Sequence, residues 1–189
     1  VLKEIQPVLD DSRIIISLAP SYSIADLKQS LGSSVRIVRA MPNTPAMVGE
    51  GMTGLSWSDD DFSESERTEL MQFFTSFGKA ETVPENLMDA VTAASGSSPA
   101  FIYMMIEALA DGVVKYGMPR DKAYTFVSQA VLGSAKMVLE TGEHPGLLKD
   151  NVCSPGGTTI VAVAELEASG FRSSLIKAAS AVCDRCRNM

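Results

Sequence analysis

Residues 13–20 read Arg-Ile-Ile-Ile-Ser-Leu-Ala-Pro, and residues 35–45 read Val-Arg-Ile-Val-Arg-Ala-Met-Pro-Asn-Thr-Pro. Each stretch is an apolar, β-branched run that leads into a loop with proline, a pattern typical of strands buried on both faces. Between them, Ser23 is placed to cap a short helix over residues 24–31. Strand, helix and strand in this order predict a βαβ unit with parallel strands.

The loops after these strands are candidate binding loops. Ligands of open α/β sheets bind beyond the carboxyl ends of the strands, and residues 19–22 and 41–45 lie at that edge. Residues 51–57 are predicted to form a further strand. Ser63 is predicted to begin an amphipathic helix that ends at Gly78, before a last short strand.

Beyond Pro84 the pattern changes to helix. We therefore expect an α/β domain over residues 1–84 and an all-helical domain over residues 85–189. Ser98 as N-cap and Pro99 at the first helical position predict the start of a long helix. That helix is apolar almost all round, and so small a helical domain cannot cover it alone. The sequence therefore predicts a subunit interface.

Residues 150–160 read Asp-Asn-Val-Cys-Ser-Pro-Gly-Gly-Thr-Thr-Ile and precede an apolar helix. Ser154, Thr158 and Thr159 supply hydroxyls, and the adjacent glycines let a ligand approach the backbone. Free N–H groups and the helix dipole favour an anion there, such as a small carboxylate. From this stretch alone, a capped helix after a tight turn is the favoured interpretation, because Pro-Gly is a common turn signal.

Composition excludes several classes of function. The chain has 189 residues, 46% of them hydrophobic, and a net charge of −7 without a long basic block, which argues against nucleic-acid binding. No apolar run is long enough to span a membrane, and no signal peptide is visible. Three cysteines, an odd number, suggest a reducing compartment, so we expect a cytoplasmic protein. The chain begins at Val1 without a methionine, which we interpret as a fragment of a longer protein.

The polar residues do not form a catalytic set of their own. His144 is the single histidine and lies in a turn, so neither a nucleophilic triad nor a zinc site with Cys183 and Cys186 is expected. The candidate loops are rich in hydroxyls, amides and glycine and lack strong acids. Such a site suits hydride transfer, in which a cofactor carries the reaction. Helix N-termini at Pro99 and Thr158 are expected to bind a carboxylate between them.

Several motifs, in this order along the chain, together closely resemble the pyrroline-5-carboxylate reductases. They are Met-Pro-Asn-Thr-Pro at 41–45, Asp-Ala-Val-Thr at 89–92, Ser-Gly-Ser-Ser-Pro-Ala-Phe at 95–101, His-Pro-Gly at 144–146, the run 149–159 and Gly-Phe-Arg-Ser at 170–173.

The resemblance implies a partial Rossmann domain with a parallel sheet, lacking its first strand and glycine-rich loop, followed by an all-helical dimerisation domain. It implies reduction of 1-pyrroline-5-carboxylate to L-proline with NADPH or NADH. It implies a homodimer in which the carboxylate loop comes from the second subunit, and larger rings of dimers. No metal is expected.

The resemblance also assigns residues. The implied substrate-binding residues are Glu85, Thr92, Ser95, Ser154, Gly156, Gly157, Thr158 and Thr159, with Thr159 and Thr92 as the catalytic candidates. The implied cofactor contacts are Leu18, Ala19, Pro20, Met41, Pro42, Asn43 and Asn151.

Two other interpretations stay open. In one, the chain serves only as a helical oligomerisation module with a half sheet. In the other, it is a different imine or hydroxyacid reductase with the same two-domain plan.

Overall fold

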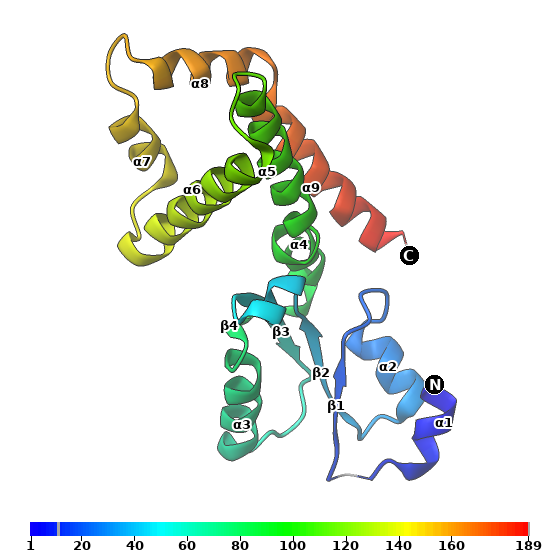
Figure 1. The fold of residues 1–189 in the computed structure, drawn as a ribbon. Coiled ribbons are helices and arrows are strands. Elements are labelled where there is room, and N and C mark those ends of the chain that lie inside the picture. The colour runs from blue at the N-terminus through cyan, green and yellow to red at the C-terminus, as the bar shows by residue number, and fades with distance from the viewer. Residues whose placement is uncertain (11, 189) are drawn as a thin grey trace. The chain divides into compact units, whose positions relative to one another are not determined.

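The computed structural model describes residues 1–10 and 12–188. The chain forms two compact units (Figure 1). The sheet unit comprises Val1–Pro99 together with the chain from Ala178 onward, and the helical unit comprises Ala100–Lys177.

The elements follow one another as predicted, strands and helices up to residue 82 and helices beyond it. The strands are β1 (Ile14–Ser17), β2 (Arg36–Met41), β3 (Gly51–Trp57) and β4 (Gly78–Thr82). The helices are α1 (Leu2–Ile5), α2 (Ile24–Leu31), α3 (Glu64–Thr75), α4 (Met88–Val91), α5 (Ser98–Val114), α6 (Arg120–Thr141), α7 (Pro145–Val152), α8 (Thr158–Ala168) and α9 (Phe171–Arg187). Shorter 3₁₀ turns lie at Gln6–Val8, Thr44–Val48 and Glu85–Leu87, and a π-helical turn lies at Thr92–Gly96.

The sheet has the strand order β1-β2-β3-β4 and is mixed. β1 pairs with β2 in parallel through α2, as the βαβ prediction requires, and β3 pairs with β4 in parallel. β2 and β3 are antiparallel, which differs from the expected parallel sheet. The cause is the short connection over residues 42–50, because a parallel crossover needs about a dozen residues or more.

Both faces of the sheet are covered. On one face, Leu27 of α2 packs with Ile37, and residues of α1 complete the cluster. On the other face, Phe74 of α3 packs with Val38 and Leu55. Ile37 and Val38 are neighbours on β2 and point to opposite faces, as strand geometry dictates. β2 is therefore buried on both sides, which confirms the interpretation of its apolar run.

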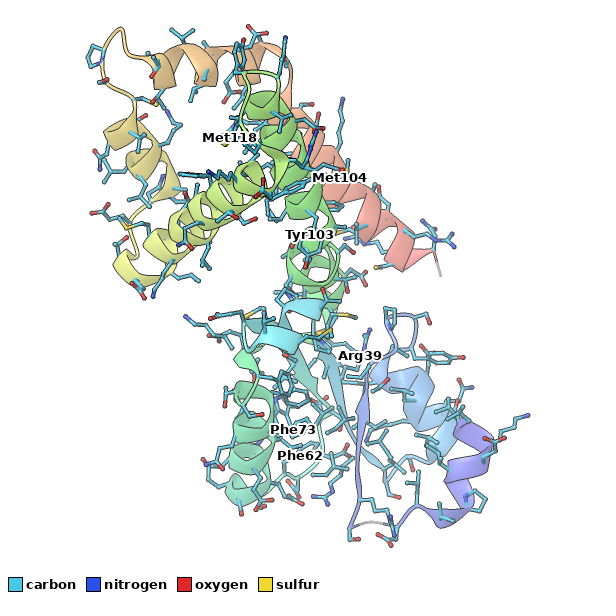
Figure 2. The ribbon with its side chains drawn as sticks, viewed as in Figure 1. Arg39, Phe62, Phe73, Tyr103, Met104 and Met118 are labelled. Atoms are coloured by element: carbon cyan, nitrogen blue, oxygen red, sulfur yellow. The ribbon has the colours of Figure 1, made fainter. Side chains whose placement is uncertain are left out.

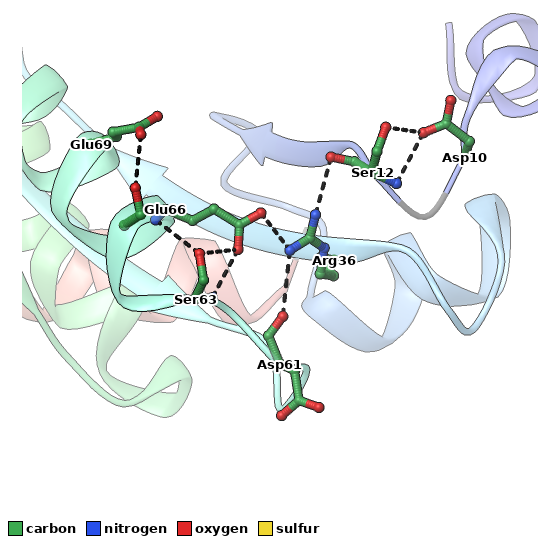
Figure 3. A network of polar contacts seen from close by, with 8 residues as sticks. Asp10, Ser12, Arg36, Asp61, Ser63, Glu66 and Glu69 are labelled. Carbon is green, nitrogen blue, oxygen red and sulfur yellow. Dashed lines mark hydrogen bonds and ion pairs between the residues drawn. The ribbon is translucent and has the colours of Figure 1, made fainter.

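An arginine ties the start of β2 to its surroundings (Figure 3). Arg36 donates to the carbonyl of Ser12 at 3.1 Å and to Oε1 of Glu66 at 2.7 Å. Glu66 also accepts the N–H of Ser63 at 2.8 Å, and Ser63 caps α3 in the predicted capping box. The network joins the segment before β1, the strand β2 and the helix α3.

The start of α5 differs from the prediction. Ser98 was expected to cap a helix after a loop, and this is wrong, because the backbone is already helical through α4 and the π-helical turn Thr92–Gly96. The Ser98 hydroxyl donates to the carbonyl of Ala94 at 2.7 Å instead. Pro99 therefore does not follow a loop, and the anion site expected at this position has no structural support.

The helical unit contains little core of its own. Among the described residues, its buried apolar side chains are Ala110 and Ala123. Large apolar side chains are exposed instead, including Tyr103 at 58% and Met104 at 69% on α5 (Figure 2) and Phe126 at 65% on α6. The apolar helix that the sequence singles out thus finds no full cover within its own unit.

Candidate active site

The N-terminus of α8, in the helical unit, is open. Gly157 occupies the N-cap position, and no side chain caps the first turn. The preceding loop turns back because Gly157 donates its N–H to the carbonyl of Ser154 at 3.0 Å, while Gly156 has a φ of +69° that suits glycine. The Ser154 hydroxyl lies so near that a Cβ on Gly157 would be 2.5 Å from its oxygen. This arrangement presents free N–H groups and a hydroxyl at the positive end of a helix.

The hydroxyls of this loop are available to a ligand. Those of Ser154, Thr158 and Thr159 make no hydrogen bond within the described part of the chain. Thr125 and Thr141, deeper in α6, instead donate to carbonyls four residues earlier at 3.0 and 2.7 Å. The first turn of a helix has no such carbonyl behind it. The position of the threonines at the start of α8 therefore keeps their hydroxyls free.

Asn151 lies on α7, near the same loop in sequence. It lines a groove of about 490 Å³ between α6 and α7, together with Met137, Glu143 and Lys149. Lys149 pairs with Asp150 at 2.5 Å, and this hydrogen bond raises the pKa of the lysine. The cofactor contact expected at Asn151 stays a prediction.

The sheet unit brings together the residues expected to face the nicotinamide. β1 and β2 are parallel, so their carboxyl ends lie at one edge of the sheet. Leu18 and Ala19 follow β1 directly, and Pro42 follows β2. Leu18 is 56% exposed and Ala19 and Pro42 are half-buried, which leaves an apolar surface at this edge. Pro20 is exposed in the same loop.

Asn43 connects this edge to the helical segment of the sheet unit. Its Nδ2 donates to the carbonyl of Ser95 at 3.0 Å, and its Oδ1 accepts the N–H of Met52 at 2.9 Å. Met41 lies beside Gly96, where an added Cβ would be 3.6 Å from the methionine sulfur. The Met-Pro-Asn loop and the Ser-Gly turn, far apart in sequence, thus pack against each other. The Asn43 amide is occupied by protein groups on both of its atoms.

Thr92 and Ser95 have hydroxyls that donate to their own helix. Thr92 donates to the carbonyl of Met88 at 2.9 Å, and Ser95 donates to that of Val91 at 3.1 Å. With the proton committed, each oxygen retains lone pairs that can accept a hydrogen bond from a ligand. Cys186 of α9 lies close to Thr92, and burial raises the pKa of its thiol.

The carboxylate of Glu85 forms a hydrogen bond and an ion pair with other residues of the sheet unit. Its Oε1 accepts the N–H of Ile24 at 2.6 Å and pairs with Arg39 at 3.0 Å. Its expected contribution to substrate binding stays a prediction.

Sequence reasoning missed Arg39 and the surroundings of Thr92. Arg39 is 7% exposed on a strand buried on both faces. The available signal was one charged residue inside the apolar run of β2, where burial requires a partner. Cys183 and Cys186 are half-buried free thiols, and Cys183 donates to the carbonyl of Asp89 at 3.7 Å.

The sheet unit fits part of a dinucleotide. The apolar edge around Leu18 and Pro42 suits an aromatic ring such as nicotinamide. Among the described residues, no group of three or more His, Cys, Asp or Glu is arranged to hold a metal. None of the described helices has the length and apolarity needed to cross a membrane.

Comparison with known proteins decides the family. A sequence model described as “Pyrroline-5-carboxylate reductase dimerisation” matches residues 85–189. The chain is 49% identical over 178 residues to the pyrroline-5-carboxylate reductase of Escherichia coli (strain K12), a match that covers 94% of this chain and 66% of that protein. It is 43% identical over 189 residues to the enzyme of the same name from Glycine max, covering 100% of this chain and 68% of that protein. The chain belongs to the pyrroline-5-carboxylate reductase family.

A solved structure of the reductase family confirms the fold class. The crystal structure of Plasmodium falciparum pyrroline carboxylate reductase with NADP bound has a TM-score of 0.92 and 35% sequence identity to this chain, and the match covers 100% of this chain and 75% of that chain. An α/β part followed by an all-helical part is therefore the architecture of this reductase-family chain, as the sequence predicts. The chain spans about two thirds of the length of the curated reductases it matches.

Proposed function

We propose that this protein reduces the cyclic imine of 1-pyrroline-5-carboxylate to L-proline with NADPH or NADH, the last step of proline biosynthesis. The observation that carries the proposal is the open N-terminus of α8 in a member of this family. There, Ser154, Thr158 and Thr159 offer unpaired hydroxyls beside free backbone N–H groups. These donors suit the carboxylate of a small amino acid, because they combine hydrogen bonds with the positive end of a helix dipole.

The substrate-binding roles follow from the same chemistry. Gly156 and Gly157 let the carboxylate approach the backbone, and Thr159 donates to it. Thr92 and Ser95 of the sheet unit line the ring pocket. Because the Thr92 hydroxyl donates to Met88, its oxygen is left to accept a hydrogen bond from the N–H of the protonated imine. This assigns Thr92 the role of an acceptor that orients the ring.

The cofactor roles rest on the strand edge. Leu18, Ala19 and Pro20, with Met41 and the two residues after it, hold the nicotinamide end of the dinucleotide, and Asn151 contacts it from the helical unit. When bound, the reduced nicotinamide supplies the hydride. The residues of the chain position the imine carbon and shield it from water, which accounts for a site without a strong acid or base.

The imine nitrogen receives its proton from water, or the substrate arrives already protonated. The hydroxyl of Thr159 or Thr92 relays this proton or orients the protonated substrate. Protonation matters because an iminium accepts a hydride more readily than a neutral imine. The expected pH profile of kcat/KM follows the ionisation of the substrate imine. A profile that tracks a protein group, and that shifts with a protein variant, would contradict this assignment.

We further propose that the working form is a homodimer that assembles into larger rings, in the cytoplasm. Exposed apolar side chains on α5 and α6 support self-association. The three free cysteines are compatible with a reducing compartment. The division into residues 1–84 and 85–189 also stays a proposal, supported by the family match that begins at residue 85.

An assay on the protein expressed from its complete coding sequence tests the main proposal. Oxidation of NADPH, followed by absorbance, should depend on added 1-pyrroline-5-carboxylate and yield L-proline. Proline should also bind in competition with the imine. Turnover that is absent with this imine but present with another imine or a hydroxyacid would favour the other reductase interpretation.

The oligomerisation module is distinguished by a binding measurement. Calorimetric titration of NADPH into this chain should release heat if the strand edge holds a dinucleotide. A folded, self-associating chain that binds no NADPH would support the module as the role of this stretch.

A further inference from the structure

An ion pair lies under the loop that joins β1 to α2. Arg39, labelled in Figure 2, is 7% exposed and donates through NH1 to Oε1 of Glu85 at 3.0 Å. Through NH2 it donates to the carbonyl of Pro20 at 3.0 Å. The same Oε1 of Glu85 accepts the N–H of Ile24 at 2.6 Å. The Arg39–Glu85 pair therefore holds both ends of the segment 20–24.

Packing supports this loop at its far end, where Ile24 lies against the cluster of Leu27 and Ile37, and much less before it. Leu18 is 56% exposed and Tyr22 is 44% exposed. Ser23, next along, forms the capping box of α2 with Asp26, so its polar groups serve the helix. Hydrogen bonds to the Arg39–Glu85 pair thus position the loop at Pro20 and add to the packing of Ile24 at its other end.

We propose that Arg39 and Glu85 are positioning residues for the dinucleotide. By holding residues 20–24, they fix the loop surface at the end of β1 that receives the nicotinamide end of the cofactor. This inference rests on the proposed function. It gives Glu85 a role that acts through the protein backbone, in place of the direct substrate contact that the family resemblance implies.

The geometry requires arginine in particular. A planar guanidinium offers donors in fixed directions, so one side chain reaches both the Pro20 carbonyl and the Glu85 carboxylate. A lysine keeps the positive charge but is a single point donor that cannot hold the same two acceptors in that geometry. Arg39→Lys therefore separates the positioning of the loop from the presence of charge.

The test compares Arg39→Lys and Glu85→Gln with Arg36→Lys, in protein expressed from the complete coding sequence. Arg36 is a matched control because it lies on the same strand and likewise connects a carboxylate, Glu66, with a backbone carbonyl. The measurements are the Kd for NADPH from its fluorescence, the separate KM values for NADPH and the imine, and hydrogen exchange over residues 18–24.

Arg39→Lys should raise both the Kd and the KM for NADPH by about tenfold, the size expected for one lost positioned hydrogen bond. The KM for the imine and kcat should change little. Exchange over residues 18–24 should become faster even without cofactor. Glu85→Gln should give a smaller change in the same direction, because the amide oxygen can still accept from Ile24. Arg36→Lys should leave the NADPH constants and this exchange as they were.

Unchanged NADPH binding and exchange in Arg39→Lys would overturn the inference, and so would equal changes in Arg36→Lys. A rise in the KM for the imine alone would contradict the inference and return Glu85 to the substrate-binding role that the family resemblance implies. If Arg39→Lys does not fold, Glu85→Gln decides by the same criteria. A wild-type protein that binds NADPH but reduces no imine would refute the proposed function, while the Kd and exchange comparisons would still decide the role of the pair.

Discussion

Thr159 and Thr125 are both helical threonines, yet their hydroxyls are in opposite situations. Thr125 donates to the carbonyl of Asp121 at 3.0 Å, whereas Thr159 is in the first turn of α8 and has no partner among the described residues. If Thr159 binds the substrate carboxylate, Thr159→Val should weaken binding by about 1–3 kcal/mol, because a buried acceptor loses its donor. The KM for the imine and the Kd for proline report this change.

Thr125→Val serves as the control, since its exposed hydroxyl bonds only within its own helix turn in the described structure. It should leave both constants unchanged. Equal constants for Thr159→Val and the wild type would remove Thr159 from the site.

For single residues, the sequence indicates which residue types lie in a site, but not which hydrogen bonds their atoms form. The Ser-Pro-Gly-Gly-Thr-Thr stretch predicts an open helix N-terminus because capping depends on local sequence, and α8 begins there. The same local reasoning fails at Ser98, because the turn preceding it is helical and supplies an acceptor at Ala94. The partners of Glu85 lie on other elements and have no local signal.

At the scale of elements, two glycines fix how β3 meets β4. Gly78 begins β4 with a φ of +151°, and a Cβ there would lie 2.0 Å from the carbonyl oxygen of Gly51. Backbone atoms cannot move aside as a side chain can, so Gly78→Ala should destabilise the sheet unit strongly. Gly32 has a φ of +124°, but a Cβ there would meet Val35 at an ordinary 3.8 Å.

Gly32→Ala is therefore the matched control for backbone strain without crowding. We expect it to lower the free energy of unfolding by about 1–2 kcal/mol, and Gly78→Ala to lower it by roughly 2 kcal/mol more through overpacking. Urea unfolding followed by the fluorescence of Trp57, the single tryptophan, measures both. Equal losses in the two variants would contradict the role of the close approach to Gly51.

The junction of α3 with β2 predicts a pH dependence. The Ser63 N–H first, and then Arg36, hold the pKa of Glu66 below its ordinary 4.5. A carboxylate with a lowered folded pKa stabilises the protein above its unfolded pKa, and this contribution is lost as the pH falls through the folded value. Part of the stability of the sheet unit should thus disappear as the pH falls below about 4.5.

Glu66→Gln cannot ionise, so its free energy of unfolding should fall less steeply over the same acid range. Urea midpoints at a series of pH values from neutral to acid give the comparison. Parallel curves for the variant and the wild type would show that Glu66 does not contribute to the acid sensitivity.

The order of elements could be predicted from the sequence, while their pairing could only be predicted in part. The apolar run of β2 and the capping box of α3 are local patterns that form as expected. The run of β1 forms the predicted strand, but it is not buried on both faces, because it lies at the edge of the sheet and Ile16 is 37% exposed. The antiparallel pairing of β2 with β3 follows from the length of a loop that the strand pattern does not encode. Gly78 was expected to end α3, but the helix ends at Thr75 and Gly78 is the first residue of β4.

At the scale of the whole molecule, the units in space are not stretches of sequence. Residues 85–99 and the chain from Ala178 onward belong to the sheet unit. Cys183 of α9 reaches the carbonyl of Asp89, on α4, at 3.7 Å. The change of composition at Pro84 shows where the chain changes from strands to helices. It does not predict which later helix packs beside α4.

The helical unit makes the strongest prediction about assembly. An apolar groove of about 580 Å³ between α5 and α6 is lined by residues such as Leu109, Val131 and Ala135, and Met104 is 69% exposed nearby in sequence on α5. Large apolar side chains exposed on both helices mark an interaction surface, and burying them drives association. We expect a dimer at low micromolar concentration by sedimentation velocity. Met104→Glu should raise the dimer dissociation constant at least about tenfold, because it places an unpaired charge in the interface.

Gln129→Glu adds the same single charge at an exposed polar position of α6 and should leave the dimer intact. The comparison separates the loss of an apolar contact from a general effect of charge on an acidic protein. Because the proposed carboxylate loop acts across the subunit interface, Met104→Glu should also lower reductase activity at protein concentrations below its dissociation constant, and higher concentrations should restore it. A stable folded monomer of the wild type would contradict the predicted dimer. A Met104→Glu protein that is monomeric yet fully active would show that each site is complete within one subunit.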